Sequence, residues 1–288
     1  MKHRFAAIIA ALLLATPAVS HAQQDFSKVE IKTTHVAGSI YMLEGSGGNI
    51  GVSVGDDGVL IVDSQFAPLS PKIEAAIEKL GKGKPRFLLN THWHGDHTGG
   101  NANFGRYADI IAHANVRKRL AAAPNANKAA FPVITFDDTL SIHFNGEEIR
   151  MIHLDPGHTD GDSFILFTGS KVAHTGDQFV NARFPFFDLA SGGDAQGYAR
   201  NIDRMLKEIP VGAKIIPGHG ALATHDDMRS TQAMLRETFG KIQRDIAAGK
   251  TLDQIKADGL PEKYKDWGAG FINASRFLEL TFNSLNKQ

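Results

Sequence analysis

Short apolar runs separated by turns dominate the chain after a polar lead-in over residues 23–34. Residues 39–44 and 50–54 predict two strands, because their apolar stretches have the length of a typical strand. The glycine-rich residues 45–49 between them are typical of a hairpin turn. No Gly-Lys-Ser/Thr follows this turn, which disfavours a phosphate-binding loop. A third run, 59–64, is apolar almost throughout and predicts a fully buried strand.

Helical spacing of apolar residues begins in the next segment. Ser70-Pro71 predicts the start of a helix, because proline fits the first helical turn, and Gly81 predicts its end. Strands are then expected over 85–90 and 108–113, followed by a helix over 115–122.

The second half of the chain combines the same two patterns. Asn145-Gly146 predicts a tight hairpin turn between two alternating strands. The sequence shows no internal repeat longer than a motif and no linker. The other expected elements are strands over 139–144, 148–154, 163–167 and 213–216, a strand beginning at 171, and helices over 195–207 and 226–248.

The composition is that of an ordinary globular protein, with 42% hydrophobic and 22% charged residues among 288. The 31 basic residues balance 31 acidic ones, and no basic run or charged tail is present. We therefore expect a small molecule rather than nucleic acid as the partner. The absence of cysteine excludes disulfides, thiolate metal ligands and a cysteine nucleophile.

The first 22 residues have the pattern of a secretory signal peptide. Lys2 and Arg4 precede the apolar run 5–15, and small residues stand at Ser20 and Ala22. The apolar run is too short for a membrane span. We expect cleavage after Ala22, a single domain over residues 23–288, and a periplasmic or secreted protein that does not contact a membrane.

The segment Thr91–Gly100 concentrates the candidate chemistry. Four residues of the types that ligate metals fall within six positions, directly after a predicted buried strand. Side chains alternate in extended backbone, so His92 and His94 can hold one ion. The turn at Gly95 then directs Asp96 and His97 towards a second ion. Histidine and carboxylate ligands without thiolate suit zinc, and also iron or manganese.

Three further polar residues, His158, Asp177 and His219, end apolar strands, and each stands beside glycine. Glycine allows the backbone to pack closely around an ion, and strand ends hold side chains rigidly. Two ions need about six or seven protein ligands if positions are left for water. The seven candidates His92, His94, Asp96, His97, His158, Asp177 and His219 fit that number.

Some other polar residues in the predicted strands have two interpretations. Asp63 ends a buried strand and needs a partner, so it either orients a metal-bound histidine or caps the following turn. His113 is ambiguous, with a structural role favoured. His143 and His153 lie within alternating strands, which also indicates structural roles.

These motifs resemble those of the metallo-β-lactamase superfamily. The matching segments are His92-Trp93-His94-Gly95-Asp96-His97, Gly157-His158-Thr159, Thr175-Gly176-Asp177 and Pro217-Gly218-His219-Gly220, with Asp63 ahead of them. They occur in the family's order across residues 40–222. The resemblance implies an α/β fold arranged as a four-layer αββα sandwich, with C-terminal helices from about residue 226.

The resemblance also implies how the ligands are divided between two zinc ions. His92, His94 and His158 would hold one ion, Asp96, His97 and His219 would hold the other, and Asp177 would bridge them. A water shared by two cations has its pKa lowered towards about 7, so hydroxide is available as a nucleophile. Asp96 is expected to orient this hydroxide and carry its proton.

The substrate class is less closely specified. At the position of Asp177 the family's β-lactamases carry Cys or Ser, whereas its glyoxalase II, lactonase, sulfatase and phosphodiesterase members carry Asp. We expect an exported dinuclear zinc hydrolase that opens a cyclic or activated carbonyl, with β-lactam hydrolysis as the leading candidate. The alternatives are a lactonase, thioesterase, sulfatase or phosphodiesterase, or a catalytically silent periplasmic metal-binding protein. Residues expected to contact substrate are Arg183, Phe184, Phe186 and Phe187.

Overall fold

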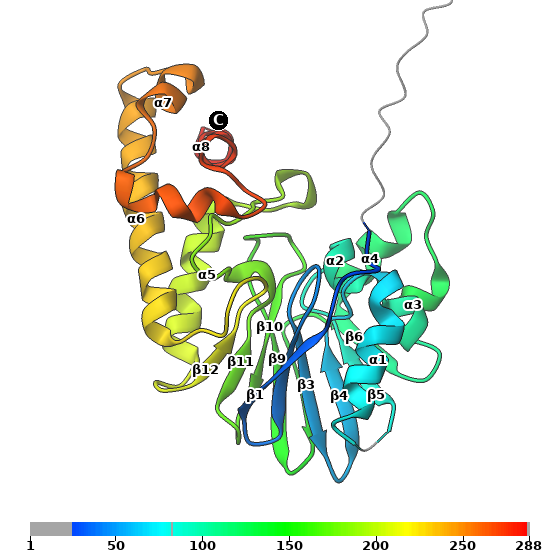
Figure 1. Cartoon of the computed structure of the whole chain (residues 1–288). Helices are drawn as coiled ribbons and strands as arrows, with labels where there is room; N and C mark the ends of the chain where they lie inside the picture. Colours follow the sequence, from blue (N-terminus) through cyan, green and yellow to red (C-terminus); the bar gives the residue numbers. More distant parts are fainter. Residues whose placement is uncertain (1–24, 82, 287–288) are drawn as a thin grey trace, which may run out of the picture.

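The computed structural model describes residues 25–81 and 83–286. The expected signal peptide over residues 1–22 lies outside the described residues. Two β-sheets stack face to face in the centre, and helices cover the outer face of each (Figure 1). The expected four-layer αββα sandwich is therefore confirmed.

The first sheet has seven strands in their order along the chain. Neighbouring strands pair antiparallel from β1 to β4 and parallel from β4 to β7. The strands are β1 (Lys32–Ala37), β2 (Ile40–Glu44), β3 (Ile50–Gly55), β4 (Gly58–Val62), β5 (Pro85–Leu89), β6 (Asp109–His113) and β7 (Ile134–Phe136).

The second sheet has five strands in the order β12-β11-β10-β9-β8. Its pairs are antiparallel except β11 with β12, which run parallel. The strands are β8 (Thr139–Phe144), β9 (Glu147–His153), β10 (Ser163–Phe167), β11 (Val172–His174) and β12 (Lys214–Ile216).

Most helices lie on the outer faces of the sheets, and short ones lie in the connecting loops (Figure 1). The α-helices are α1 (Ser70–Glu78), α2 (Gly95–Thr98), α3 (Asn101–Phe104), α4 (Ala114–Ala122), α5 (Ala195–Glu208), α6 (His225–Ala247), α7 (Leu252–Asp258) and α8 (Ala274–Leu285). The 3-10 helices are η1 (Ala67–Leu69), η2 (Lys128–Ala130), η3 (Gly176–Gln178), η4 (Leu189–Ser191) and η5 (Glu262–Ala269).

Three main apolar clusters hold these layers together. The central cluster joins the inner faces of the sheets, as Leu60 and Val62 pack with Met151 and Ile165. A second cluster joins the seven-stranded sheet to α1, and a third joins the five-stranded sheet to α5, α6 and α8. Burial of apolar surface at each of these contacts is the main force that stabilises the fold.

Two sequence expectations about strands need correction. Residues 23–34 were expected to be a loose lead-in, but β1 begins at Lys32. Its residues are largely polar because it lies at the edge of the sheet with only β2 as its neighbour. No strand was expected at β7, which is only three residues long and forms the opposite edge.

The loops at the two ends of the sheets differ in character. At one end, long loops follow β4, β5, β9, β11 and β12. At the other end, tight turns join β3 to β4 and β8 to β9, and the backbone N–H of Asn145 donates to Asp57 Oδ2 at 2.7 Å to link them. The long loops carry the candidate ligands.

Candidate metal centre

The seven ligand candidates meet at one edge of the sandwich. His92 and His94 follow β5, and the short helix α2 carries Asp96 and His97. The other three come from loops of the five-stranded sheet, so each sheet supplies part of the cluster. The residues brought together are His92, His94, Asp96, His97, His158, Asp177 and His219.

One group consists of three histidines. Nitrogen atoms of His92, His94 and His158 all lie within 4.8 Å of one another. His94 Nδ1 and His158 Nε2 are only 2.8 Å apart. His92 Nε2 is buried and has no hydrogen-bond partner among the described residues. A buried nitrogen without a partner is costly in a folded protein, unless something else binds it.

The second group consists of Asp96, His97 and His219, whose ligand atoms also lie within 4.8 Å of one another. His219 Nε2 is 3.2 Å from Asp96 Oδ2 and 3.4 Å from His97 Nε2. This grouping is the one that the motif resemblance implies for a second ion.

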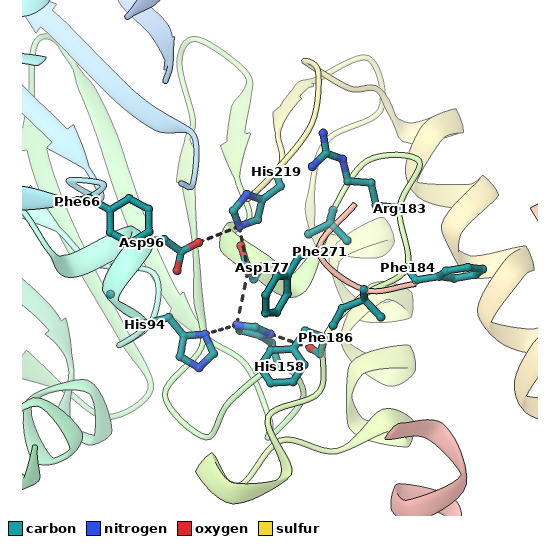
Figure 2. Close-up of a pocket in the computed structure, with 13 residues that line it drawn as sticks. Phe66, His94, Asp96, His158, Asp177, Arg183, Phe184, Phe186, His219 and Phe271 are labelled. Carbon is teal, nitrogen blue, oxygen red and sulfur yellow. Dashed lines mark hydrogen bonds and ion pairs between the residues drawn. The ribbon is translucent and has the colours of Figure 1, made fainter. Parts of the chain in front are cut away.

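Asp177 lies between the two groups (Figure 2). Its Oδ1 is 3.0 Å from His97 Nε2, and its Oδ2 is 3.3 Å from His219 Nε2 and 3.6 Å from His158 Nε2. The carboxylate therefore faces ligands of both groups, as a bridging ligand must.

Two glycines allow this close packing. A Cβ on Gly48 would lie 2.1 Å from His97 Cε1, and a Cβ on Gly218 would lie 2.1 Å from Asp177 Oδ1. Any larger residue would displace a ligand. The side-chain amide of Asn49 donates to the Pro217 carbonyl at 2.9 Å, which ties the β2–β3 turn to the loop that carries His219.

Asp63 orients two of the histidines. His97 Nδ1 donates to Asp63 Oδ2 at 2.7 Å, and the Thr91 hydroxyl donates to the same oxygen at 2.8 Å. Because that hydroxyl hydrogen is used, Thr91 Oγ1 accepts from His92 Nδ1 at 3.0 Å. His92 Nε2 thus keeps its lone pair facing the cluster, and Asp63 holds the His97 ring so that its Nε2 faces the cluster as well. Of the two interpretations of Asp63, the structure favours orientation of a histidine.

A single loop after Asp177 orients the other two motif histidines. His94 Nε2 donates to Asp188 Oδ2 at 2.9 Å, and His158 Nδ1 donates to the Phe186 carbonyl at 2.8 Å. Carboxylates and carbonyls accept only, so His94 Nδ1 and His158 Nε2 are the unprotonated atoms. Two lone pairs at such a short separation repel each other, and a cation between them would remove that repulsion.

The pKa values of the cluster residues bear on whether the cluster can bind a cation. Burial, with His97 and His158 nearby, lowers the pKa of His92 well below its ordinary value, so the ring is neutral and can bind a metal. Burial opposes ionisation of Asp177, yet His219 and His97 hold its pKa well below the usual range. The neutral ring of His92 and the ionised carboxylate of Asp177 are donors that divalent cations prefer. Without an ion, and against the effect of burial, Asp177 and Asp96 raise the pKa of His97 above its ordinary value and that of His219 to about 9, so a cation bound here would replace protons on these two rings.

His113, His143 and His153 stand apart from this cluster, as expected. His113 is the N-cap of α4 and accepts from the backbone N–H of Asn115 at 3.3 Å. His153 Nδ1 donates to the Asp162 carbonyl at 2.8 Å, and His143 is exposed on β8.

A cavity of about 530 Å³ opens onto the ligands, within the size range of small-molecule sites. Figure 2 shows its aromatic residues on both sides of the ligand groups. Its lining consists of Phe66, His94, Gly95, Asp96, His158, Asp177, Val180, Arg183, Phe184, Phe186, His219, Phe271 and Ile272.

The structure agrees only in part with the expected substrate contacts. Arg183, Phe184 and Phe186 line the cavity, but the expectation for Phe187 is wrong. Its ring is fully buried in the core against Tyr198 and Phe277, because successive side chains of this loop point in different directions.

Several residues at the site were not singled out from the sequence. Asp188 belongs to no recognisable motif and meets a histidine 94 positions away. Phe66 and Phe271 come from distant loops, and only their aromatic character could have drawn attention to them.

The sandwich and its edge cluster have the organisation of a metal-dependent hydrolase. Residues 43–223 match the family model described as the metallo-beta-lactamase superfamily. This match spans more than half of the chain, which therefore belongs to that superfamily.

Curated relatives are similar over part of their length. A hydroxyacylglutathione hydrolase of Anaeromyxobacter dehalogenans is 27% identical over 180 residues, which cover 59% of this chain and 65% of the relative. The lactamase-like protein nscB of Trichophyton rubrum is 28% identical over 174 residues, which cover 59% of this chain and 48% of the relative. The matched regions thus span less than two thirds of either relative.

Solved structures share the fold at low identity. A metallo-beta-lactamase from Pontibacter korlensis superposes with a TM-score of 0.63 at 15% identity, covering 72% of this chain and 99% of that one. A double mutant of the sec-alkyl sulfatase PisA1 gives 0.70 at 16% identity, covering 89% of this chain and 50% of that one.

Proposed function

We propose that the chain is a periplasmic dinuclear zinc hydrolase that opens an activated carbonyl, such as a β-lactam, a lactone or a thioester. The observation that supports this most directly is the pair of ligand groups that share Asp177 at the floor of an apolar cavity. Nitrogen and carboxylate donors without thiolate suit zinc, and also iron or manganese, and we propose zinc as the resident metal.

Each residue of the cluster has a defined part in this proposal. His92, His94 and His158 would hold one ion, Asp96, His97 and His219 would hold the other, and Asp177 faces both groups and would be shared by them. Bound zinc supplies a polarising charge for the carbonyl oxygen and a water acidic enough to act as a nucleophile near neutral pH.

Asp96 is the residue best placed to handle protons. Its side chain is about one quarter exposed, lines the cavity and has Oδ2 3.2 Å from His219 Nε2. A carboxylate in this position can accept a proton from the attacking water and pass it to the leaving group. The aromatic residues of the cavity exclude bulk water around the reacting bond.

Two features bear on the substrate. Apolar side chains form most of the cavity walls, and Arg183 stands among them without an ion-pair partner in the described part of the chain. We propose that Arg183 binds an anionic group of the substrate. Curated relatives that match the chain include proteins named hydroxyacylglutathione hydrolase and lactamase-like protein, which supports acyl substrates.

The test is metal analysis of the purified protein together with a panel of β-lactams, lactones, thioesters, phosphodiesters and alkyl sulfates. We expect about two zinc ions per chain and turnover of at least one carbonyl class. Turnover of only phosphodiesters or sulfates would replace the proposed substrate class. Bound zinc with no turnover at all would instead indicate a silent metal-binding protein.

A ligand variant separates metal-dependent turnover from a contaminating activity. His94→Ala should lose one ion and reduce kcat by at least about a thousandfold, because a ligand and its polarising cation are both removed. His143→Ala is the matched control, since His143 is exposed on β8 outside the cluster. Full activity of His94→Ala without bound metal would overturn the mechanism.

A further inference from the structure

Phe271 is the most unusual surface residue near the cavity. Four large apolar side chains are exposed among the described residues: Val133, Ile134, Val211 and Phe271. Only Phe271 among them lines the cavity, and 90% of its surface is open to solvent. Exposed aromatic surface at the mouth of an apolar cavity indicates a contact that a bound molecule completes.

Phe271 faces a second aromatic ring that touches the ligand group directly. Its ring centroid lies 6.1 Å from that of Phe186, edge to face. Phe186 in turn stacks on His94 at 6.0 Å and meets His158 edge-on at 5.8 Å. These contacts form a continuous aromatic surface from His94 and His158 through Phe186 to Phe271.

The loops that carry these two rings are fastened together. The backbone N–H of Phe184 donates to the Trp267 carbonyl at 3.1 Å, and the Phe184 ring stacks on Phe277 at 4.6 Å. Gly270 lies against the stem of Arg183, where an added Cβ would be 3.1 Å from Arg183 Cδ. The loop before α8 is thus held in a fixed position beside the cavity.

A third ring completes the apolar surroundings from the opposite side. Phe66, from the loop between β4 and α1, lines the cavity on the Asp96 side of the ligand groups (Figure 2). Phe186 and Phe271 lie on the His158 side. Apolar rings thus stand on both sides of the ligand groups, and burying an apolar group between them would be favourable.

We propose that Phe186 and Phe271 form an aromatic clamp that binds the apolar acyl group of the substrate, and that Phe271 sets the preference for its length. The substrates are acyl compounds whose acyl group has about four or more carbons or an aromatic ring. This inference rests on the proposed function, because it places the reacting carbonyl at the ligand groups. It assigns a specificity role to the C-terminal segment, outside the residues that match the family model.

The test compares acetyl, butyryl and hexanoyl esters of p-nitrophenol on wild type, Phe271→Ala and Phe271→Leu. We expect kcat/KM of the wild type to rise with chain length. Phe271→Ala should raise KM for the hexanoyl ester about tenfold and change that for the acetyl ester less than twofold, with kcat nearly constant. Phe271→Leu should recover part of the preference, because it restores apolar contact.

Val211→Ala is the matched control, since Val211 is also apolar and 83% exposed but does not line the cavity. Its KM values for the acetyl and hexanoyl esters should equal those of the wild type. Equal changes for acetyl and hexanoyl esters in Phe271→Ala, or no change for either, would overturn the clamp.

Direct binding separates failure of the clamp from failure of the proposed function. Calorimetry on zinc-loaded protein should give tighter binding of hexanoate than of acetate, and Phe271→Ala should reduce that difference about tenfold. This readout does not depend on turnover, so it tests the clamp even if no ester is hydrolysed. Identical hexanoate affinity in wild type and Phe271→Ala would overturn it.

Discussion

At the scale of single residues, the outward-facing nitrogens of the histidines are as important as the nitrogens that face the cluster. His94, His97 and His158 each donate one ring N–H to a group that can only accept: Asp188, Asp63 and the Phe186 carbonyl. The orientation of each ring is therefore set before any ion arrives. Such prior orientation reduces the entropy cost of binding.

Asp188 gives a direct test of this orientation. In Asp188→Asn the amide nitrogen takes the place of Oδ2 and presents an N–H to His94 Nε2. His94 Nε2 must then accept this hydrogen bond, so the ring hydrogen moves to Nδ1, the atom that faces the cluster. We expect zinc affinity to fall about 10–100-fold while the fold is retained. Competition with a coloured chelator measures the affinity, and circular dichroism measures the fold.

Asp253→Asn serves as the control for the Asp188 variant, because Asp253 is an exposed carboxylate in the first turn of α7. It should leave zinc affinity unchanged. Wild-type affinity in Asp188→Asn would show that His94 needs no such partner.

Sequence reasoning at the residue scale found the ligands from two local patterns. Four ligand types are concentrated within residues 92–97, and His158, Asp177 and His219 each end an apolar run beside glycine. Asp188 has no local signal, since its role depends on a histidine 94 positions away. The run from Phe184 to Phe187 was expected to line the cavity as a whole. Only the folded loop distinguishes Phe186, in the cavity, from Phe187, in the core.

At the scale of secondary structure, most elements could be predicted from apolar spacing and end signals, including α1, α5 and α6. The strands that were missed lie at sheet edges, where β1 is polar and β7 is short. Pairing across sequence-distant strands, which places the ligand loops together, is a tertiary property that local patterns do not contain.

Contact between α5 and the loop before His158 gives a second prediction. A Cβ on Gly197 would lie only 1.8 Å from the Pro156 carbonyl oxygen, so Gly197→Ala must push helix and loop apart. We expect it to lower the free energy of unfolding by at least about 2 kcal/mol. Urea denaturation measures the change.

Gly240→Ala is the matched control for the Gly197 variant. Gly240 lies within α6, and its added Cβ would meet only the Arg244 guanidinium, at 3.4 Å. Alanine there should stabilise the protein by about 0.5–1 kcal/mol through helix propensity. Equal effects of the two substitutions would mean that the close packing of α5 is not rigid.

The ends of β6 and β9 meet through a pair of stacked histidines. The rings of His113 and His153 lie parallel at 3.6 Å, and they link the two sheets. Burial and the neighbouring His153 lower the pKa of His113 from 6.5 to about 4, against the opposing carboxylates of Asp137 and Asp160. The folded state therefore disfavours the protonated ring.

This lowered pKa predicts an acid-dependent loss of stability. Below pH 6.5 His113 takes up a proton in the unfolded chain but stays neutral in the folded protein. The free energy of unfolding therefore falls as the pH is lowered to about 4 and is constant below that pH. Between pH 7.5 and 5 the wild type should lose about 2 kcal/mol more than His113→Asn. Urea denaturation at both pH values measures this difference. The ligand histidines are the same in both proteins, so the effect of their titration cancels when the two losses are subtracted. Equal losses in the two proteins would refute it.

At the scale of the whole molecule, the ligand cluster joins both sheets. His92, His94, Asp96 and His97 follow β5, whereas His158, Asp177 and His219 come from the five-stranded sheet. Ions bound here would hold the two halves of the sandwich together in addition to their chemistry.

Among the described residues no helix has both the length and the apolar character needed to cross a bilayer.

Metal removal should therefore weaken the whole protein. Binding to the folded state alone stabilises it by about 2.7 kcal/mol when the free ion is at 100 times its dissociation constant. We expect a chelator to lower Tm and the free energy of unfolding by at least about this amount, and zinc to restore both. Calorimetric scans with metal analysis measure the effect.

His92→Ala is the control for metal removal, because it lacks a ligand of the buried group and should respond less to the chelator. An unchanged Tm after the ions have demonstrably left would show that the sheets do not depend on them.

The end of the sandwich opposite the ligand loops offers a place for attachment. Gly212 lies in the exposed turn before β12, and an added Cβ there would meet no described atom within 4 Å. A short tether inserted at this turn could anchor the protein to a bead or an electrode with the cavity facing the liquid. Immobilised in this way, the protein would keep its substrate path open, whereas random coupling through lysines would block it in some of the molecules.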